Sequence, residues 1–212
     1  MLQSEKILEE LSSSGFSIVS DFLAPGFVER LCEDLNQLRS NNAFHEARVG
    51  QGAKSSLEQS IRRDSISWFE PQSLSQVQKE LWEHLERLKR QMNVGLFLGL
   101  WDFEGHYAIY QPGGFYDRHL DRFKTDDLRK VSVVLYLNSD WTDADGGELA
   151  LFLDSAAEPL LIQPRSGTAV FFLSDRIEHQ VRATSRERLS FAGWFRTRSP
   201  GLNRTLSSDF QG

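Results

Sequence analysis

This sequence of 212 residues has a single cysteine and no excess of basic charge. Cys32 is the only cysteine, so the chain can form neither an internal disulfide nor a cysteine-based zinc site, and we predict a cytoplasmic location. The 24 Lys and Arg residues against 30 Asp and Glu residues give a net charge of −6, which argues against nucleic-acid binding. No apolar run approaches the roughly 20 residues that cross a bilayer, and the first residues lack the pattern of a secretory signal. We therefore expect no membrane association and no export.

Apolar material is sufficient for one folded domain. Hydrophobic residues make up 40% of the chain and include 15 Phe and 5 Trp. A chain of this length can bury roughly 70% of the surface that its unfolded form exposes. We expect a single domain over residues 1–199, with a helical part over about 1–95, a β-rich part over about 96–199 and a polar tail over 200–212. We also expect a monomer.

Helical periodicity dominates the first 95 residues. Apolar residues three and four apart predict helices over about residues 2–11, from Pro25 to about Leu38, and over about 73–92. Strand patterns are expected at 16–19 and 61–69.

Short strands separated by glycine-containing turns follow from residue 96 onward. Trp68 and Trp101 are expected to be core residues. About eight strands at this spacing predict a mainly β fold, a jelly-roll barrel or sandwich, with the N-terminal helices packed on one sheet. The predicted strands are 106–110, 115–119, 131–137, 148–152, 160–162, 168–172, 178–181 and 188–195.

Two of the five histidines suggest a metal site. His119 and Asp121 are two residues apart in a strand pattern, so their side chains can point to the same side of a sheet. His179 begins a later strand and can supply a third ligand. Two imidazoles and one carboxylate make the facial triad of non-haem Fe(II) enzymes, which leaves coordination positions open. The alternative is that these histidines are scattered and hold no metal.

Arg188 is a charged residue within an apolar strand pattern. A buried guanidinium needs an anion, and Ser190 shares its face of the strand. The pair can hold a carboxylate, and 2-oxoglutarate fits, with its keto-acid end on the metal and its far carboxylate on Arg188. In the alternative, Arg188 pairs with an internal Asp or Glu or faces solvent.

Several spaced motifs, in the same order, resemble the prolyl 4-hydroxylases of the 2-oxoglutarate- and Fe(II)-dependent oxygenase superfamily. The resemblance is strongest to the hypoxia-inducible-factor prolyl hydroxylases and their bacterial relatives, and it implies a double-stranded β-helix. Arg63 stands where relatives commonly have glycine. The motifs lie at 61–68, 95–100, 110–121, 135–141, 146–149, 172–176, 179–181 and 188–194.

The resemblance also implies roles for individual residues. It places His119, Asp121 and His179 on the iron and Arg188 on the far carboxylate of 2-oxoglutarate, which Ser190 would share by its position on the strand. Further cosubstrate residues are Tyr136, which donates to the same carboxylate, Tyr110 near the metal, and Leu149 and Val181 as apolar walls. The substrate residues are Trp194 beside the proline, Arg129, Arg62, Asp64 and Tyr116, the last with ordinary packing as its alternative.

The activity implied is hydroxylation of a proline at C4 in a protein, with Fe(II), 2-oxoglutarate and O2, and with ascorbate as reductant. Bacterial relatives point to a proline in switch I of elongation factor Tu, and eukaryotic relatives act on a transcription factor. The glycine-rich stretch 48–56 occupies the place of a finger that closes over the substrate, and we expect it to be open without substrate. An oxygenase of a small molecule or of another residue type, and a catalytically silent jelly-roll binding module, are the two alternatives.

Overall fold

Three α-helices carry most of the N-terminal part of the chain, close to their predicted positions. Pro25 stands in the first turn of its helix, where a missing N–H costs nothing. Ser75 and Gln78 form a capping box that starts the longest helix. The computed structural model describes residues 3–48, 58–122, 128–154 and 156–198. The helices are α1 (Gln3–Ser13), α2 (Pro25–Ser40) and α3 (Gln76–Leu96), and a 3₁₀ turn spans Asp143–Asp145.

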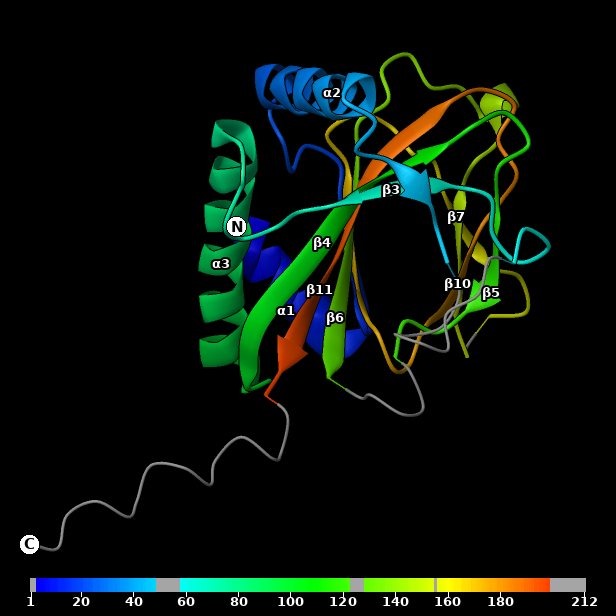
Figure 1. Ribbon diagram of the computed structural model, residues 1–212. Coiled ribbons are helices and arrows are strands. Elements are labelled where there is room, and N and C mark those ends of the chain that lie inside the picture. The colour runs from blue at the N-terminus through cyan, green and yellow to red at the C-terminus, as the bar shows by residue number, and fades with distance from the viewer. Residues whose placement is uncertain (1–2, 49–57, 123–127, 155, 199–212) are drawn as a thin grey trace, which may run out of the picture.

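Two antiparallel sheets form the rest of the molecule (Figure 1). The larger has the strand order β1-β9-β6-β11-β4-β3-β2, and the smaller has the order β5-β10-β7-β8. The larger sheet contains β1 (Phe16–Val19), β2 (His45–Glu46), β3 (Ser65–Trp68), β4 (Leu100–Tyr110), β6 (Arg129–Tyr136), β9 (Ala169–Leu173) and β11 (Arg188–Thr197). The smaller contains β5 (Tyr116–His119), β7 (Leu149–Phe152), β8 (Leu160–Ile162) and β10 (Glu178–Val181). The predicted jelly roll with helices on one sheet is confirmed.

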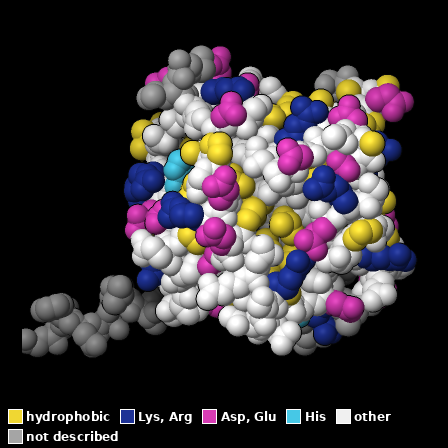
Figure 2. All heavy atoms as spheres, turned by 90° about the horizontal axis from the view of Figure 1, so that it is seen from above, with side chains coloured by type: hydrophobic (Ala, Val, Ile, Leu, Met, Phe, Trp, Pro, Cys, Tyr) yellow, Lys and Arg dark blue, Asp and Glu magenta, His cyan; other side chains and the backbone are white. Residues whose placement is uncertain are grey.

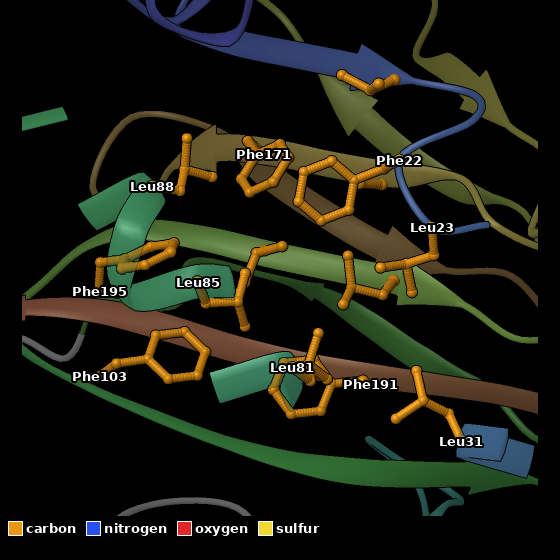
Figure 3. Close-up of a cluster of buried hydrophobic side chains, with 14 of the residues drawn as sticks. Phe22, Leu23, Leu31, Leu81, Leu85, Leu88, Phe103, Phe171, Phe191 and Phe195 are labelled. Carbon is orange, nitrogen blue, oxygen red and sulfur yellow. The ribbon is translucent and has the colours of Figure 1, made fainter. Parts of the chain in front are cut away.

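The helices cover one face of the larger sheet, and the smaller sheet faces the other (Figure 1). Leu81 and Leu85 of α3 pack with Phe103, Phe191 and Phe195 of β4 and β11 in the main hydrophobic cluster (Figure 3). A second cluster, between the sheets, joins side chains from both of them, such as those of Phe172 and Leu151. The central strands β4, β6, β9 and β11 are therefore largely buried on both faces, and their side chains alternate between two interiors.

Some boundaries differ from the sequence-based expectation. β4 begins at Leu100 rather than near residue 106, because its first residues pair with the end of β11. β3 covers only Ser65–Trp68 of the predicted 61–69 strand. Trp101 was expected in the core, and this was wrong: it is 55% exposed, with the Arg198 guanidinium carbon 3.9 Å from its ring centroid.

The predicted finger at 48–56 lies, apart from Arg48, outside the described residues, as does the tail at 200–212. The domain limits and the monomeric state stay predictions. Within the described ranges, no helix has the length and apolar character needed to cross a membrane. On the face shown in Figure 2, basic and acidic side chains are interspersed.

Candidate active site

A cavity of about 150 Å³ lies between the two sheets. Side chains from β3, β4, β6 and β11 line it from the larger sheet, and side chains from β5, β7 and β10 line it from the smaller one. It contains the predicted metal-ligating and cosubstrate-binding residues His119, Asp121, His179 and Arg188. The strand pairing explains this convergence, because His119 on β5 stands directly opposite His179 on β10.

His119, Asp121 and His179 bring their ligand atoms within 4.8 Å of one another. The Nε2 atom of His119 lies 3.6 Å from one carboxylate oxygen of Asp121, and Nε2 of His179 lies 3.5 Å from the other. Asp121 and His179 are buried, and His119 is partly buried. The spacing and the donor set therefore fit one divalent metal ion with two nitrogen ligands and one oxygen ligand.

The other ring nitrogen of each histidine contacts a main-chain carbonyl. Nδ1 of His119 lies 2.7 Å from the carbonyl oxygen of Asp117, and Nδ1 of His179 lies 3.3 Å from that of Ile177. A carbonyl accepts only, so Nδ1 carries the proton and Nε2 keeps a lone pair for a metal. Burial lowers the pKa of His179 to about 4, against the opposing effect of Asp121. The imidazole is therefore neutral, as a ligand must be.

Asp121 is held by a pair of serines that sequence reasoning missed. Ser132 Oγ donates to a carboxylate oxygen of Asp121 at 2.7 Å and lies 2.8 Å from Ser174 Oγ. Burial by itself would raise the pKa of Asp121, but the neighbouring histidines and Arg129 outweigh it and hold this pKa well below its ordinary value. The carboxylate is therefore ionised and fixed in orientation. The sequence did offer one indication of Ser132. It lies four residues before Tyr136 on the same strand, so the two side chains point to the same side of the sheet.

Arg188 is a buried cation that has no carboxylate partner in the part of the chain that the structure describes. It is 1% exposed, and none of the ion pairs among the described residues involves it. Nε donates to the Gly147 carbonyl at 2.9 Å, and Nη1 donates to Ser190 Oγ at 3.1 Å. Nη2 has no hydrogen-bond partner in the described part of the chain. A buried guanidinium in this state calls for an anion, so the site fits the far carboxylate of 2-oxoglutarate.

Two tyrosines flank this guanidinium. Its central carbon lies 5.0 Å from the ring centroid of Tyr110 and 5.1 Å from that of Tyr136. Burial raises the pKa of Tyr136 to about 12, so its hydroxyl keeps its proton. This hydroxyl is buried and has no partner among the described residues, as expected of a donor to a carboxylate that Arg188 also binds.

Gly147 completes this end of the cavity. Its φ of +69° favours glycine, and a Cβ there would lie 3.1 Å from Cδ of Arg188. Leu149 and Val181 are paired on neighbouring strands and line the cavity, at the positions expected of its apolar walls. Gly147 therefore accepts a hydrogen bond from Arg188 through its carbonyl and, because it lacks a side chain, leaves room for the side chain of Arg188.

Trp194 lies on β11 at the other end of the row of cavity-facing residues that begins with Arg188. The Arg129 guanidinium covers its ring, with 3.6 Å between the guanidinium carbon and the ring centroid. Glu104, which sequence reasoning also missed, accepts from Arg129 Nε at 2.8 Å and from Arg196 at 2.7 Å. Arg129 is thus held against the predicted proline-binding surface.

Tyr116, Arg62 and Asp64 lie together beside the metal ligands. The Tyr116 ring stacks on the His119 ring with centroids 3.6 Å apart. The Arg62 guanidinium carbon lies over the Tyr116 ring, 4.3 Å from its centroid, and Arg62 donates to both oxygens of Asp64 at 2.8 and 2.6 Å. Burial by itself would lower the pKa of Arg62, but the hydrogen bond to Asp64 raises it above its ordinary value. Tyr116 and Arg62 support the ring of His119 and also border the cavity, and Asp64 holds Arg62 in place.

Comparison with known proteins finds related enzymes over nearly the whole chain. The family model described as "2OG-Fe(II) oxygenase superfamily" matches residues 105–196. The crystal structure of a Pseudomonas putida prolyl-4-hydroxylase is 37% identical, with a TM-score of 0.84, and the match covers 93% of this chain and 100% of that one. A prolyl hydroxylase from Trichoplax adhaerens, solved with a hypoxia-inducible-factor peptide, shares the fold with a TM-score of 0.81 at 24% identity, over 91% of this chain and 88% of that one.

Human "Egl nine homolog 1" is 28% identical over 90% of this chain. The Caenorhabditis elegans protein named "Hypoxia-inducible factor prolyl hydroxylase" is 25% identical over 92% of it. The chain spans 46% of the human protein and 28% of the worm protein.

Proposed function

Because the chain belongs to the 2-oxoglutarate- and Fe(II)-dependent oxygenase superfamily, we propose that it is a prolyl 4-hydroxylase that modifies a protein. The members of this superfamily use Fe(II), 2-oxoglutarate and O2. The observation that carries the proposal is the unpaired buried guanidinium of Arg188 in the same cavity as the three clustered ligands His119, Asp121 and His179.

The three ligand residues would hold Fe(II) and leave positions open for other ligands. Arg188, Ser190 and Tyr136 would orient 2-oxoglutarate through its far carboxylate. When bound, the metal and cosubstrate supply oxidative decarboxylation: O2 is consumed, 2-oxoglutarate becomes succinate and CO2, and the substrate gains one hydroxyl.

The protein would also have to exclude water and position C4 of the substrate proline. Leu149 and Val181 present apolar surface beside the metal site. Trp194, covered by Arg129, offers a flat surface of the kind against which a proline ring packs. A saturated ring with no N–H donor suits such a surface better than a polar side chain does.

Elongation factor Tu, hydroxylated at a proline of switch I, is the substrate that we propose. Support comes from the resemblance of the sequence motifs to bacterial members of the family. It also comes from the higher identity to the Pseudomonas putida enzyme, at 37%, than to human "Egl nine homolog 1", at 28%. Ascorbate as reductant belongs to the same proposal.

Mass spectrometry tests the proposal. Purified elongation factor Tu is incubated with the enzyme, Fe(II) and 2-oxoglutarate, and in parallel with the His179→Ala variant. We expect a gain of one oxygen atom on a switch I proline in the first reaction only. Hydroxylation of a proline in another protein instead would change the proposed substrate but support the proposed activity. Turnover of 2-oxoglutarate that responds to small molecules, and to no prolyl protein, would contradict the proposed function.

A further inference from the structure

His106 is a buried histidine that neither the metal site nor the cosubstrate site uses. It lies on β4, is 4% exposed and forms part of the cavity wall. Its ring clusters with two tryptophans, with centroids 4.8 Å from Trp68 and 5.5 Å from Trp194, which are themselves 6.1 Å apart. It is paired across the strands with Ala192, a small residue that leaves space in front of it. The imidazole therefore belongs to the same end of the cavity as the predicted proline-binding surface.

The ring of His106 presents a hydrogen-bond acceptor. Nδ1 lies 3.2 Å from the Tyr107 carbonyl oxygen, which fixes the proton on Nδ1 and leaves a lone pair on Nε2. Burial, with Arg62 as a further cause, lowers the pKa of His106 to about 3, so the ring is neutral. Within the described ranges, Nε2 has no hydrogen-bond partner of its own.

The neighbouring tryptophan carries the complementary group. Nε1 of Trp194 is a buried N–H donor without a partner in the described part of the chain. Leaving a buried donor unpaired costs free energy, so an open donor and an open acceptor on two rings that line one cavity, with centroids 5.5 Å apart, point to a ligand that satisfies both. An extended peptide residue presents its own N–H and C=O to the same side of the chain.

We propose that His106 is a substrate-binding residue whose Nε2 accepts the main-chain N–H of the residue after the target proline, while Trp194 Nε1 donates to a main-chain carbonyl of the same segment. Proline itself has no N–H, so the next residue carries the nearest main-chain donor on its C-terminal side. This inference rests on the proposed function and adds to it a contact with the peptide backbone.

A double-mutant cycle tests the contact. The probe is a synthetic peptide around the switch I proline of elongation factor Tu, made with either an amide or an ester after the proline; the ester lacks the N–H. Binding of each peptide is measured by fluorescence anisotropy under nitrogen, with the enzyme loaded with Fe(II) and 2-oxoglutarate. The variants are His106→Met, which keeps volume without the acceptor, and His106→Gln, whose amide oxygen can replace it. His84→Gln is the control, since His84 lies on α3 against Phe22.

We expect the ester to bind wild type about tenfold more weakly than the amide. The two peptides should bind His106→Met within about twofold of each other, whereas His106→Gln and His84→Gln should keep most of the difference. An amide-to-ester ratio in His106→Met equal to that of wild type would overturn the contact. That result leaves the proposed function standing if wild type hydroxylates the amide peptide; an enzyme that hydroxylates no prolyl peptide removes both.

Discussion

The two faces of the larger sheet differ in how their polar groups are satisfied. On the helix-covered face, the Tyr107 hydroxyl donates to Asp34 at 3.0 Å, and Gln78 of α3 donates to the same carboxylate at 2.9 Å. On the cavity face, the hydroxyl of Tyr136 and Nη2 of Arg188 are equally buried but have no partner among the described residues. Both faces belong to the same sheet, so side-chain parity decides whether a polar group meets the helices, which supply partners, or the cavity, which does not.

That difference separates stability from function. The helix-covered face is filled by apolar side chains that pack against one another, as Phe103, Phe191 and Phe195 do. The cavity face keeps charged and polar groups whose partners a ligand must supply, at a cost in folding free energy. Changes on the first face should lower stability, and changes on the second should lower ligand binding.

The largest effect is expected from His179→Ala on the cavity face. Loss of one of three metal ligands should reduce Fe(II)-dependent succinate production by more than about 100-fold. The fold should persist, because the side chain leaves a polar cavity rather than the hydrophobic core. Succinate assays and circular dichroism measure the two effects, and full succinate production by this variant would remove His179 from the metal site.

Phe191→Ala is the counterpart on the helix-covered face. Phe191 is fully buried and packs against Phe69, Phe103 and Tyr107, so its truncation should lower the free energy of unfolding by about 3–5 kcal/mol. Urea denaturation gives this value. Well below the melting temperature, affinity for 2-oxoglutarate should stay within about twofold of wild type. A large loss of affinity with little loss of stability would erase the distinction between the faces.

Ser132→Ala removes the hydrogen bond to Asp121 without touching a metal ligand. Supporting bonds of this kind are worth about tenfold or more in metal affinity. We expect Fe(II) affinity to fall by about tenfold in an anaerobic competition with a chelator. The matched control is Ser17→Ala, because Ser17 is equally buried but donates to Glu10, next to the helices. Equal effects of the two changes would mean that general destabilisation is being measured.

The smallest effects come from a pair of tyrosine hydroxyls. Tyr107→Phe should lower the free energy of unfolding by about 1 kcal/mol and leave the 2-oxoglutarate requirement unchanged. Tyr136→Phe should do the reverse, with little loss of stability and an apparent 2-oxoglutarate requirement raised about fivefold. Each variant removes one hydroxyl oxygen from one face of the sheet. Chemical denaturation of both variants measures the loss of stability, and cosubstrate titration measures the 2-oxoglutarate requirement.

Sequence patterns were enough to identify what depends on parity within one strand. Arg188 and Ser190 share a face of β11, and the structure brings them into the cavity together with His119 and Asp121, although β5 ends at His119 and Asp121 follows it. Helix starts were also predictable, because Pro25 carries a local signal for one.

Features that depend on contacts between distant strands were not predictable. Glu104 meets Arg129 and Arg196 only after three strands are in register. Ser132 has a role only once the fold brings β6 beside Asp121, which follows the end of β5. The pattern of a single strand shows which side a residue such as Ser132 faces, but it does not show which residue of another segment it meets.

The central claim is that Arg188, which has no carboxylate partner among the described residues, binds the far carboxylate of 2-oxoglutarate. The most direct test is anaerobic titration calorimetry of the Fe(II)-loaded enzyme with 2-oxoglutarate and with 2-oxopentanoate, which has the same chain length and keto-acid end but lacks the far carboxylate. We predict that 2-oxoglutarate binds wild type at least about 100-fold more tightly, and that Arg188→Lys reduces this preference by about tenfold or more. Equal affinities of wild type for the two compounds would contradict the account.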